Sequence, residues 1–514
     1  MPEAARADRH FRDSSSRGHI RGSWLLAAGR ILNVAVDFAA QVLIVRYLST
    51  SSYGAFSYAL SVVALTTSVA TLGLDKAIGR FVPLYDERGE HGRLLGAWLL
   101  VGTSVLLVGF AMVPLLFALE AVLSGTAISD EQGVALLLIL IVLSPLNAFG
   151  AITSQMLATF ASPVLILVRT YLVLPLLQIG VVLLVIWSGS DVELLAFGWV
   201  ATVFISAVIS LGLLIGVLRS RGVLSRVSLE RLQLPAREVL LFGLPLFASN
   251  VVFQLRLTGA VVLLEGMHGT GEVALFRAAI PIARQCLLLF ETFSLLFTPL
   301  AARLFARRDW RGLNEAYWQS AIWIAVATVP IFLVAFGLAE PLSVFLYGER
   351  YRSSGPILAI LTVGFYVSAA IGFNEIVLRI FGRVGVALAI DATTTVAGLG
   401  LGMVLIGELG AVGAALTVCV IMVAQKVLYH LVLARATDIR LFEPDQSGVY
   451  AAIMAGACAL WVFQSLVHPT LIAGLPVAAA IALVILLVAR GSLRVGHVFP
   501  EMRRWRLIAW LIRD

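Results

Sequence analysis

The sequence of 514 residues carries unusually little charge. Only 13% of its residues are charged, whereas a water-soluble domain carries roughly 25%. Hydrophobic residues make up 60% of the chain, and its mean hydropathy is +0.97. This composition excludes an ordinary soluble domain and predicts that most of the chain lies in a bilayer. In such a chain the net charge of +7 is typical of membrane topology signals, so we expect no nucleic-acid partner.

Cysteine and lysine are also scarce. The three cysteines lie inside apolar runs, without the spacing of a disulfide framework or a metal site: Cys286, Cys419 and Cys458. Lys76 and Lys426 are the only lysines, and no Gly-x-x-x-x-Gly-Lys-[Ser/Thr] phosphate loop occurs. The chain therefore lacks the motif of an ATP-driven pump, and we expect neither a cofactor nor a metal.

Apolar runs long enough to cross a bilayer, at about 20 residues each, recur through the chain. None alternates with the period of a membrane β-barrel, so helices are the expected structure. The predicted spans cover residues 23–46, 55–74, 94–118, 134–158, 163–187, 194–217, 239–264, 272–300, 318–338, 356–378, 384–407, 411–434, 449–467 and 470–489. The predicted fold class is therefore an all-α polytopic membrane protein with about 14 transmembrane helices.

Arginines lie in alternate loops between these runs, and only residues 339–355 break the pattern, with Arg350 and Arg352. They are dense in residues 1–22, 218–238 and 490–514, whereas the loops near 119–133 and 188–193 contain none. The positive-inside rule then places both termini in the cytoplasm and requires an even number of crossings. The first apolar run is longer than a signal-peptide core, so we expect it to remain as a membrane anchor.

The charged segment 218–238 divides the predicted helices into six before it and eight after it. We predict six parts: a cytoplasmic tail (1–22), an N-lobe (23–217), a cytoplasmic linker (218–238), a C-lobe (239–434), a helix pair (449–489) and a basic interfacial tail (490–514). Because each lobe has six helices, both lobes begin in the cytoplasm and form parallel repeats, and a binding site is expected between them.

Polar side chains inside a spanning helix are costly and usually face a cavity or a partner. In the first helix such residues recur at steps of three and four, which places them on one face: Arg30, Asn33, Asp37 and Gln41. The seventh helix carries Arg256 near its middle, too deep to reach the headgroups easily. A cavity-lining role and a buried ion pair with Asp37 are the two interpretations of Arg256.

The eighth predicted helix carries a second polar stripe. Its members recur every seven residues, again on one face: Arg277, Arg284, Glu291 and Thr298. Other charged residues in spans have simpler explanations. Arg169 and Lys426 lie near enough to a helix end to reach the headgroups, and Glu375 can pair with Arg379 one turn away.

The deep charges are more often basic than acidic, so the predicted interior is cationic. Arginine binds phosphate and carboxylate through paired, charge-assisted hydrogen bonds, which suits a diphosphate or an acidic sugar. The predicted substrate-binding residues are Arg30, Asn33, Arg256, Arg277 and Arg284. The candidate carriers of a coupling ion are Asp37, Glu291 and Asp391, with a role as simple counter-ions the equal alternative.

Several segments resemble a known family. The run "VRYLSTSSYGAFSYALSVVALTTSVATLGLDKAIGRFVPLYDERGE" (45–90) is similar to the amino-terminal signature of Wzx-type polysaccharide-export flippases, a branch of the multidrug/oligosaccharidyl-lipid/polysaccharide (MOP) superfamily. Further similar segments are "FGLPLF" (242–247), "FLYGERYRSSGPILAIL" (345–361) and "GELGAVGAALT" (407–417). The resemblance implies two six-helix bundles in a MATE-like V shape around a central cavity, with the last helix pair at the side.

The resemblance also implies an activity. It is the translocation of undecaprenyl-diphosphate-linked oligosaccharide across the bacterial inner membrane for exopolysaccharide, O-antigen or capsule biosynthesis. The expected partners are this lipid, membrane lipids, a glycan polymerase and glycosyltransferases. The alternative is a MATE-like, cation-coupled drug or small-molecule antiporter. A membrane enzyme is disfavoured because the outward loops are short and carry no recognisable catalytic constellation, so we predict no catalytic residue.

Overall fold

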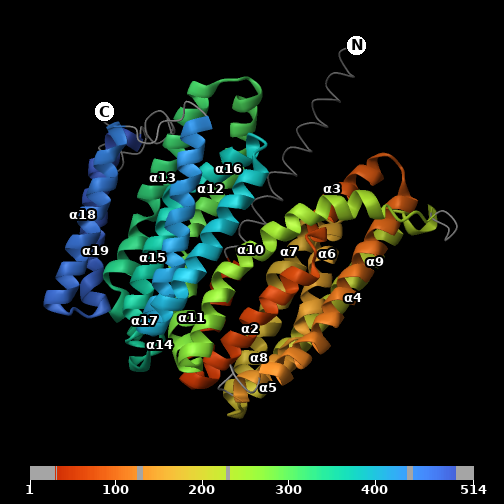
Figure 1. The fold of residues 1–514 in the computed structure, drawn as a ribbon, viewed down its shortest axis with the longest axis horizontal. Helices are drawn as coiled ribbons and strands as arrows, with labels where there is room; N and C mark the ends of the chain where they lie inside the picture. The colour runs from red at the N-terminus through yellow and green to blue at the C-terminus, as the bar shows by residue number, and fades with distance from the viewer. Residues whose placement is uncertain (1–28, 30–31, 124–130, 227–231, 437–443, 494–514) are drawn as a thin grey trace. The chain divides into compact units, whose positions relative to one another are not determined.

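Helices form every regular element that the computed structural model describes (Figure 1). The described residues are 29, 32–123, 131–226, 232–436 and 444–493. Within them, eleven helices are long and apolar enough to cross a membrane, or twelve if the bent pair α15 and α16 forms one span. The all-α, multi-pass class is therefore confirmed. The predicted count of about 14 is not confirmed by these numbers and stays a prediction.

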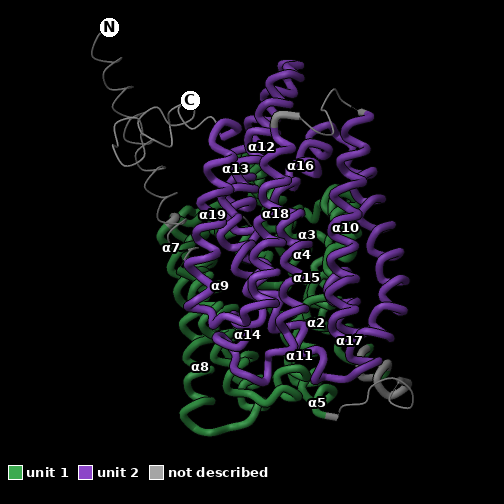
Figure 2. Tube along the Cα trace, turned by 90° about the vertical axis from the view of Figure 1, so that its left-hand side faces the viewer, with its two compact units in different colours: residues 1–254 green, residues 255–514 purple. Residues whose placement is uncertain are grey.

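The chain divides into two compact units, residues 1–254 and 255–514, which Figure 2 colours separately. The first unit contains a helix over residues 32–47, then α2 (Thr50–Ala70), α3 (Leu74–Glu87), α4 (His91–Leu123), α5 (Glu131–Leu140), α6 (Leu143–Phe160), α7 (Pro163–Leu167), η1 (Val168–Val173), α8 (Leu174–Ser188), α9 (Val192–Ser220) and η2 (Leu224–Arg226). The boundary falls inside α10 (Ala236–His268). The predicted lobe limits stay a prediction.

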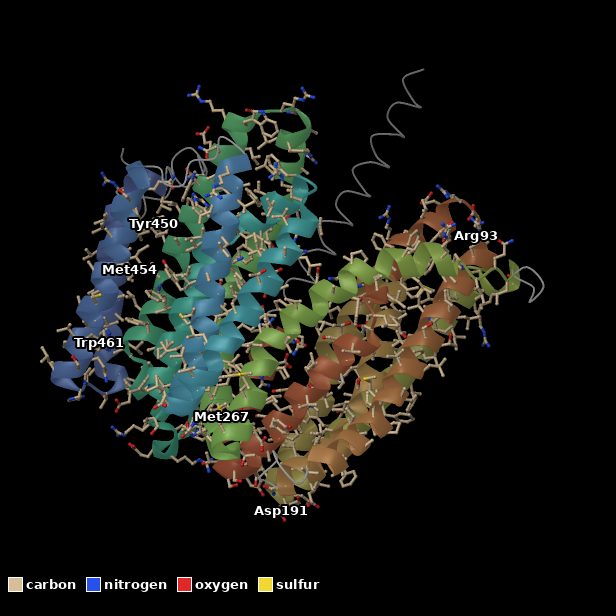
Figure 3. The ribbon with its side chains drawn as sticks, viewed as in Figure 1. Arg93, Asp191, Met267, Tyr450, Met454 and Trp461 are labelled. Atoms are coloured by element: carbon tan, nitrogen blue, oxygen red, sulfur yellow. The ribbon has the colours of Figure 1, made fainter. Side chains whose placement is uncertain are left out.

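In its described residues the second unit continues from α10 with nine more α-helices and one short 3₁₀ turn. They are α11 (Thr270–Arg284), α12 (Leu287–Ala306), α13 (Trp310–Gly337), α14 (Ala339–Tyr347), η4 (Glu349–Tyr351), α15 (Ser354–Ala370), α16 (Phe373–Ile380), α17 (Val384–Ala436), α18 (Pro444–Val467) and α19 (Leu471–Leu493). The last pair packs on itself and on α13. Met454 and Trp461 on α18 (Figure 3) are more than half exposed, as lipid-facing apolar side chains are.

A short amphipathic helix, α3, occupies residues that the sequence predicted as a loop. Leu74, Ile78 and Val82 on its apolar face are buried in the core of the first unit. The face includes Tyr85, whose hydroxyl donates to Glu238 Oε2 in α10 at 3.1 Å. Burial and this hydrogen bond raise the pKa of Tyr85 to about 12, so the phenol keeps its proton and donates at neutral pH.

The basic face of α3 binds the first half of α10. Lys76 Nζ donates to Asn250 Oδ1 at 2.9 Å, and the Arg80 guanidinium lies 4.6 Å from the centre of the Phe242 ring. Lys76 and Arg80 therefore hold α3 against α10.

Two backbone breaks shape the second unit. The predicted eighth helix, 272–300, is interrupted, because α11 ends at Arg284 and α12 begins at Leu287. Pro281 lacks an N–H group, which weakens the helix just before the break. The residues of the predicted polar stripe therefore belong to two successive helices, and their common face stays a prediction.

The second break divides α17 at Gly410, whose φ of 56° and ψ of −130° are not helical. This agrees with the predicted ends of two spans at 407 and 411. Gly398 approaches Ile421, and Gly402 approaches Thr417, so the two halves pack side by side through small residues. The Glu272 carboxylate accepts the N–H of Ala411 at 2.9 Å, which satisfies a free donor at the start of the second half.

The turn before α3 depends on glycine. Gly73 has a φ of +67°, and a Cβ there would lie 2.5 Å from Phe247 N and 2.6 Å from Gly243 O. Gly89 has a similar φ of +70° with nothing within 4 Å, so Gly89→Ala is a matched control for the backbone strain alone. We expect Gly89→Ala to lower the free energy of unfolding by about 1 kcal/mol. Gly73→Ala should cost about 1–3 kcal/mol more, because backbone atoms must move apart.

The measurement is the melting temperature of each purified variant in the same neutral detergent. Equal losses for the two variants would contradict the close approach of α10 to this turn.

Candidate functional site

Polar residues of the second unit gather where α16 meets α17. A bend of 41° separates α15 from α16 at residues 371–372. Asn374, just after the bend, is fully buried and donates from Nδ2 to the backbone carbonyl of Lys426 at 2.8 Å. This hydrogen bond fixes the register of α16 against the second half of α17.

The next residue, Glu375, accepts from two cations. Its Oε1 lies 2.7 Å from Arg379 Nη2, and its Oε2 lies 3.4 Å from Lys426 Nζ. The predicted pair between Glu375 and Arg379 is therefore confirmed. The prediction that Lys426 reaches the headgroups is wrong, because its side chain is buried and its ammonium group turns toward Glu375.

Arg256 contributes a third cation from α10. Its Nη1 donates to Gln425 Oε1 at 2.7 Å, and Gln425 is itself buried beside Lys426 in α17. Asp391 and Glu375 lie near enough for their charges to act on the guanidinium. The amide orients one end of the fork, and the carboxylates offset part of its desolvation cost.

Asp391 lies in the first half of α17. Its Oδ1 accepts from the hydroxyl of Tyr429 at 2.8 Å, and the same hydroxyl lies 3.2 Å from the carbonyl oxygen of Ala387. Asp391 and Tyr429 are equally far in sequence from Gly410, so the break at Gly410 is what brings them together. The Lys426 ammonium lies 5.6 Å from the centre of the Tyr429 ring.

We name these residues the unit 2 charge cluster: Arg256, Glu375, Arg379, Asp391, Gln425, Lys426 and Tyr429. Three cations face two carboxylates, so the cluster carries a net positive charge when both carboxylates are ionised. Such a set can bind an anion through its basic groups, and Asp391 can gain or lose a proton. Among the described residues no group of three or more His, Cys, Asp or Glu side chains could hold a metal ion.

The predicted polar stripe of the first helix lies in the first unit. Asn33 Nδ2 donates to Asp37 Oδ2 at 2.6 Å, which confirms that these residues share a face. Gln41, one turn further on, donates to the hydroxyl of Tyr53. Arg30 lies outside the described residues. A binding role for Arg30 and Asn33, a coupling role for Asp37 and the alternative pair of Asp37 with Arg256 stay predictions.

The other predicted stripe is divided between two helices. Arg277 is half-buried in α11, whereas Arg284 is the last residue of that helix and its side chain is 65% exposed. Arg284 Nη2 lies 3.9 Å from Glu291 Oε1 of α12, a long ion pair across the break. Roles in substrate binding or coupling for these three residues stay predictions.

Sequence reasoning missed several members of the unit 2 charge cluster. Lys426 and Glu375 were each explained within their own helix, and Gln425 and Tyr429 were not considered. The available signal was the adjacent pair Gln425–Lys426, followed one turn later by Tyr429, inside an otherwise apolar span. Three polar side chains at such spacing need partners on another helix.

Comparison with known proteins gives one family and one fold. Residues 20–294 match the family described as "Polysaccharide biosynthesis protein". No curated protein matches the chain. The chain is also similar to solved structures of MOP superfamily transporters and of a flippase. Their sequence identity to this chain is low, so the similarity shows the fold alone.

Three of these structures illustrate the match. The lipid II flippase MurJ in an inward closed conformation is 14% identical, with a TM-score of 0.68 over 93% of this chain and 100% of that chain. An inward-facing MATE family multidrug resistance transporter is 15% identical, with a TM-score of 0.65 over 79% and 94%. A MOP superfamily transporter from Pyrococcus furiosus, whose binding pocket is described as having reverse polarity, is 14% identical, with a TM-score of 0.56 over 81% and 94%.

The shared carboxylate of the unit 2 charge cluster gives a stability test. Glu375→Gln leaves two cations without their acid, and we expect it to destabilise the protein by about 3 kcal/mol. Lys426→Met leaves Glu375 paired with Arg379 and should cost about 1 kcal/mol. The double variant Glu375→Gln/Lys426→Met should be more stable than Glu375→Gln alone. Melting temperatures in detergent test this order, and additive losses in the double variant would contradict the ion pair.

Proposed function

The chain belongs to the polysaccharide biosynthesis protein family, and from this membership we propose that it flips undecaprenyl-diphosphate-linked oligosaccharides across the bacterial inner membrane. It is a multi-pass membrane protein with the fold of MOP superfamily transporters. We propose that both termini lie in the cytoplasm. The proposed partners are a glycan polymerase and glycosyltransferases, which would consume and supply the lipid-linked glycan.

The observation that carries this proposal is the net positive charge of the unit 2 charge cluster. A diphosphate is an anion that must leave water, and its transfer into a low-dielectric region requires positive charge and hydrogen-bond donors. Arg256 offers both positive charge and N–H donors, and Gln425 orients one end of its fork. A lipophilic cation, the typical drug substrate of an antiporter, would be repelled by the same charge.

We assign roles within this proposal. Arg256 is the principal diphosphate ligand, and Arg30, Asn33, Arg277 and Arg284 are further contacts for the diphosphate or the sugars. Translocation proceeds by alternating access, with the polyprenyl chain remaining in lipid. Exposure of the bound headgroup first to one side and then to the other would complete the transfer without a covalent step.

Among the candidate coupling carboxylates we favour Asp391 over Asp37 and Glu291. Asp391 is held by the Tyr429 hydroxyl and lies near the cations that the diphosphate would approach. A phosphate bound at Arg256 would neutralise part of the positive charge near Asp391. The Asp391 carboxylate would then be less stabilised, which favours its protonation. Substrate binding and proton binding would then be coupled through Arg256.

The substrate assignment is tested by substitutions at Arg256. We expect Arg256→Gln to lower translocation of the lipid-linked oligosaccharide about tenfold to a hundredfold, the loss of one or two charge-assisted hydrogen bonds. Arg256→Lys should keep part of the activity. Arg383→Gln is the matched control, since Arg383 is an exposed arginine of the same unit between α16 and α17.

The measurement is the fraction of oligosaccharide lipid that becomes accessible on the far side of proteoliposomes. Wild-type transport by Arg256→Gln would contradict the assignment. Depletion of the protein in its host gives an independent test, because a complete lipid-linked repeat unit should then accumulate in the inner leaflet. Unchanged lipid-linked glycans together with altered drug sensitivity would favour the antiporter instead.

The coupling assignment has its own test. If Asp391 carries the coupling proton, Asp391→Asn should remove the response of transport to an imposed proton gradient while substrate binding persists. Tyr429→Phe should weaken the response without abolishing it, since the carboxylate remains. Glu291→Gln serves as the matched control and should respond as wild type does. A gradient response retained in Asp391→Asn would exclude Asp391 as the carrier.

A further inference from the structure

Arg169 lies on the π-helical turn η1 in the first unit, far in sequence from the unit 2 charge cluster. Pro175, which has no N–H, follows this turn at the start of α8. π-helical turns inside α-helices are frequent at functional sites. The guanidinium of Arg169 is bound by residues of two other helices, and its predicted reach toward the headgroups stays a prediction.

Both partners of Arg169 are neutral. Its Nε donates to the hydroxyl of Ser210 in α9 at 2.6 Å, and its Nη1 donates to the hydroxyl of Ser154 in α6. The Ser154 hydroxyl in turn donates to the carbonyl of Gly150, and that of Ser210 donates to the carbonyl of Ser206. The two serine oxygens are therefore oriented as acceptors, and they fix the plane of the guanidinium.

No carboxylate pairs with Arg169 in the part of the chain that the structure describes. A half-buried arginine inside a membrane bundle without a counter-ion is costly. Two of its five N–H groups are engaged by the serines, so the others remain for an anion.

Arg169 lines a cavity of about 220 Å³. Ser154, Gln155, Arg169 and Thr170 provide its polar lining, and the rest of the lining is apolar, for example Leu165. A water occupies roughly 30 Å³ of liquid, so this cavity has room for a phosphate group.

We propose that Arg169, with Ser154 and Thr170, forms a binding site for a phosphate group of a membrane lipid. The guanidinium supplies the charge-assisted hydrogen bonds, and the apolar wall accommodates the adjoining glycerol and acyl carbons. Arg169 lies about 9 Å along the helix axis from Pro163, where this span begins, which is close enough to a bilayer surface for a headgroup phosphate to enter. The site does not depend on the proposed flippase substrate.

The test is lipid binding to the purified full-length protein, measured by native mass spectrometry from a neutral detergent. The probe is phosphatidic acid, with phosphatidylcholine as the lipid background. We expect Arg169→Gln to bind phosphatidic acid about tenfold more weakly than wild type. Arg219→Gln is the matched control, because Arg219 is an exposed arginine in the last turn of α9 in the same unit and should bind as wild type does.

Two further arms keep the test decisive. Ser154→Ala retains the charge but loses the oxygen that orients the guanidinium, so it should weaken binding by a smaller factor. It replaces Arg169→Gln if that variant does not fold. Unchanged binding in both Arg169→Gln and Ser154→Ala would overturn the site. Displacement of phosphatidic acid by millimolar inorganic phosphate would assign the site to free phosphate and overturn the lipid assignment.

Discussion

The shared carboxylate of Glu375 is the interaction on which the unit 2 charge cluster depends. Lys426 is nearly fully buried, and an ammonium group in that position is tolerated only beside an anion. Because Glu375 also holds Arg379, a single acid offsets the charge of two cations. The charge of Arg256 is tolerated in the same region because Asp391 lies nearby and Gln425 accepts a hydrogen bond from the guanidinium.

Backbone breaks put these groups in one place. The bend before α16 presents Asn374 and Glu375 to α17, and the reversal at Gly410 brings Asp391 to Tyr429. Each break lies where an uninterrupted helix would have carried its polar residues away from their partners. The glycines of α17 add to this effect, since close packing of its two halves shortens the distance that the side chains must span.

Arginine serves both units, with different partners. In the second unit Arg256 lies among carboxylates, as a group that exchanges one anion for another would. In the first unit the described partners of Arg169 are only serine hydroxyls, which orient its guanidinium but do not neutralise its charge. The first environment suits transient binding of a charged substrate, whereas the second suits a phosphate that stays bound.

The sequence by itself determined the membrane class, the approximate ranges of most long helices and the polar residues inside them, because hydropathy and helical spacing are local properties. It also predicted the pair of Glu375 with Arg379, which lies within one helix. It could not show that Lys426 turns inward, that the regular helix is interrupted between Arg284 and Leu287, or that Arg169 meets two serines. Those outcomes depend on which helices are neighbours. Only the tertiary structure decides which partners stabilise a buried charge in a low dielectric.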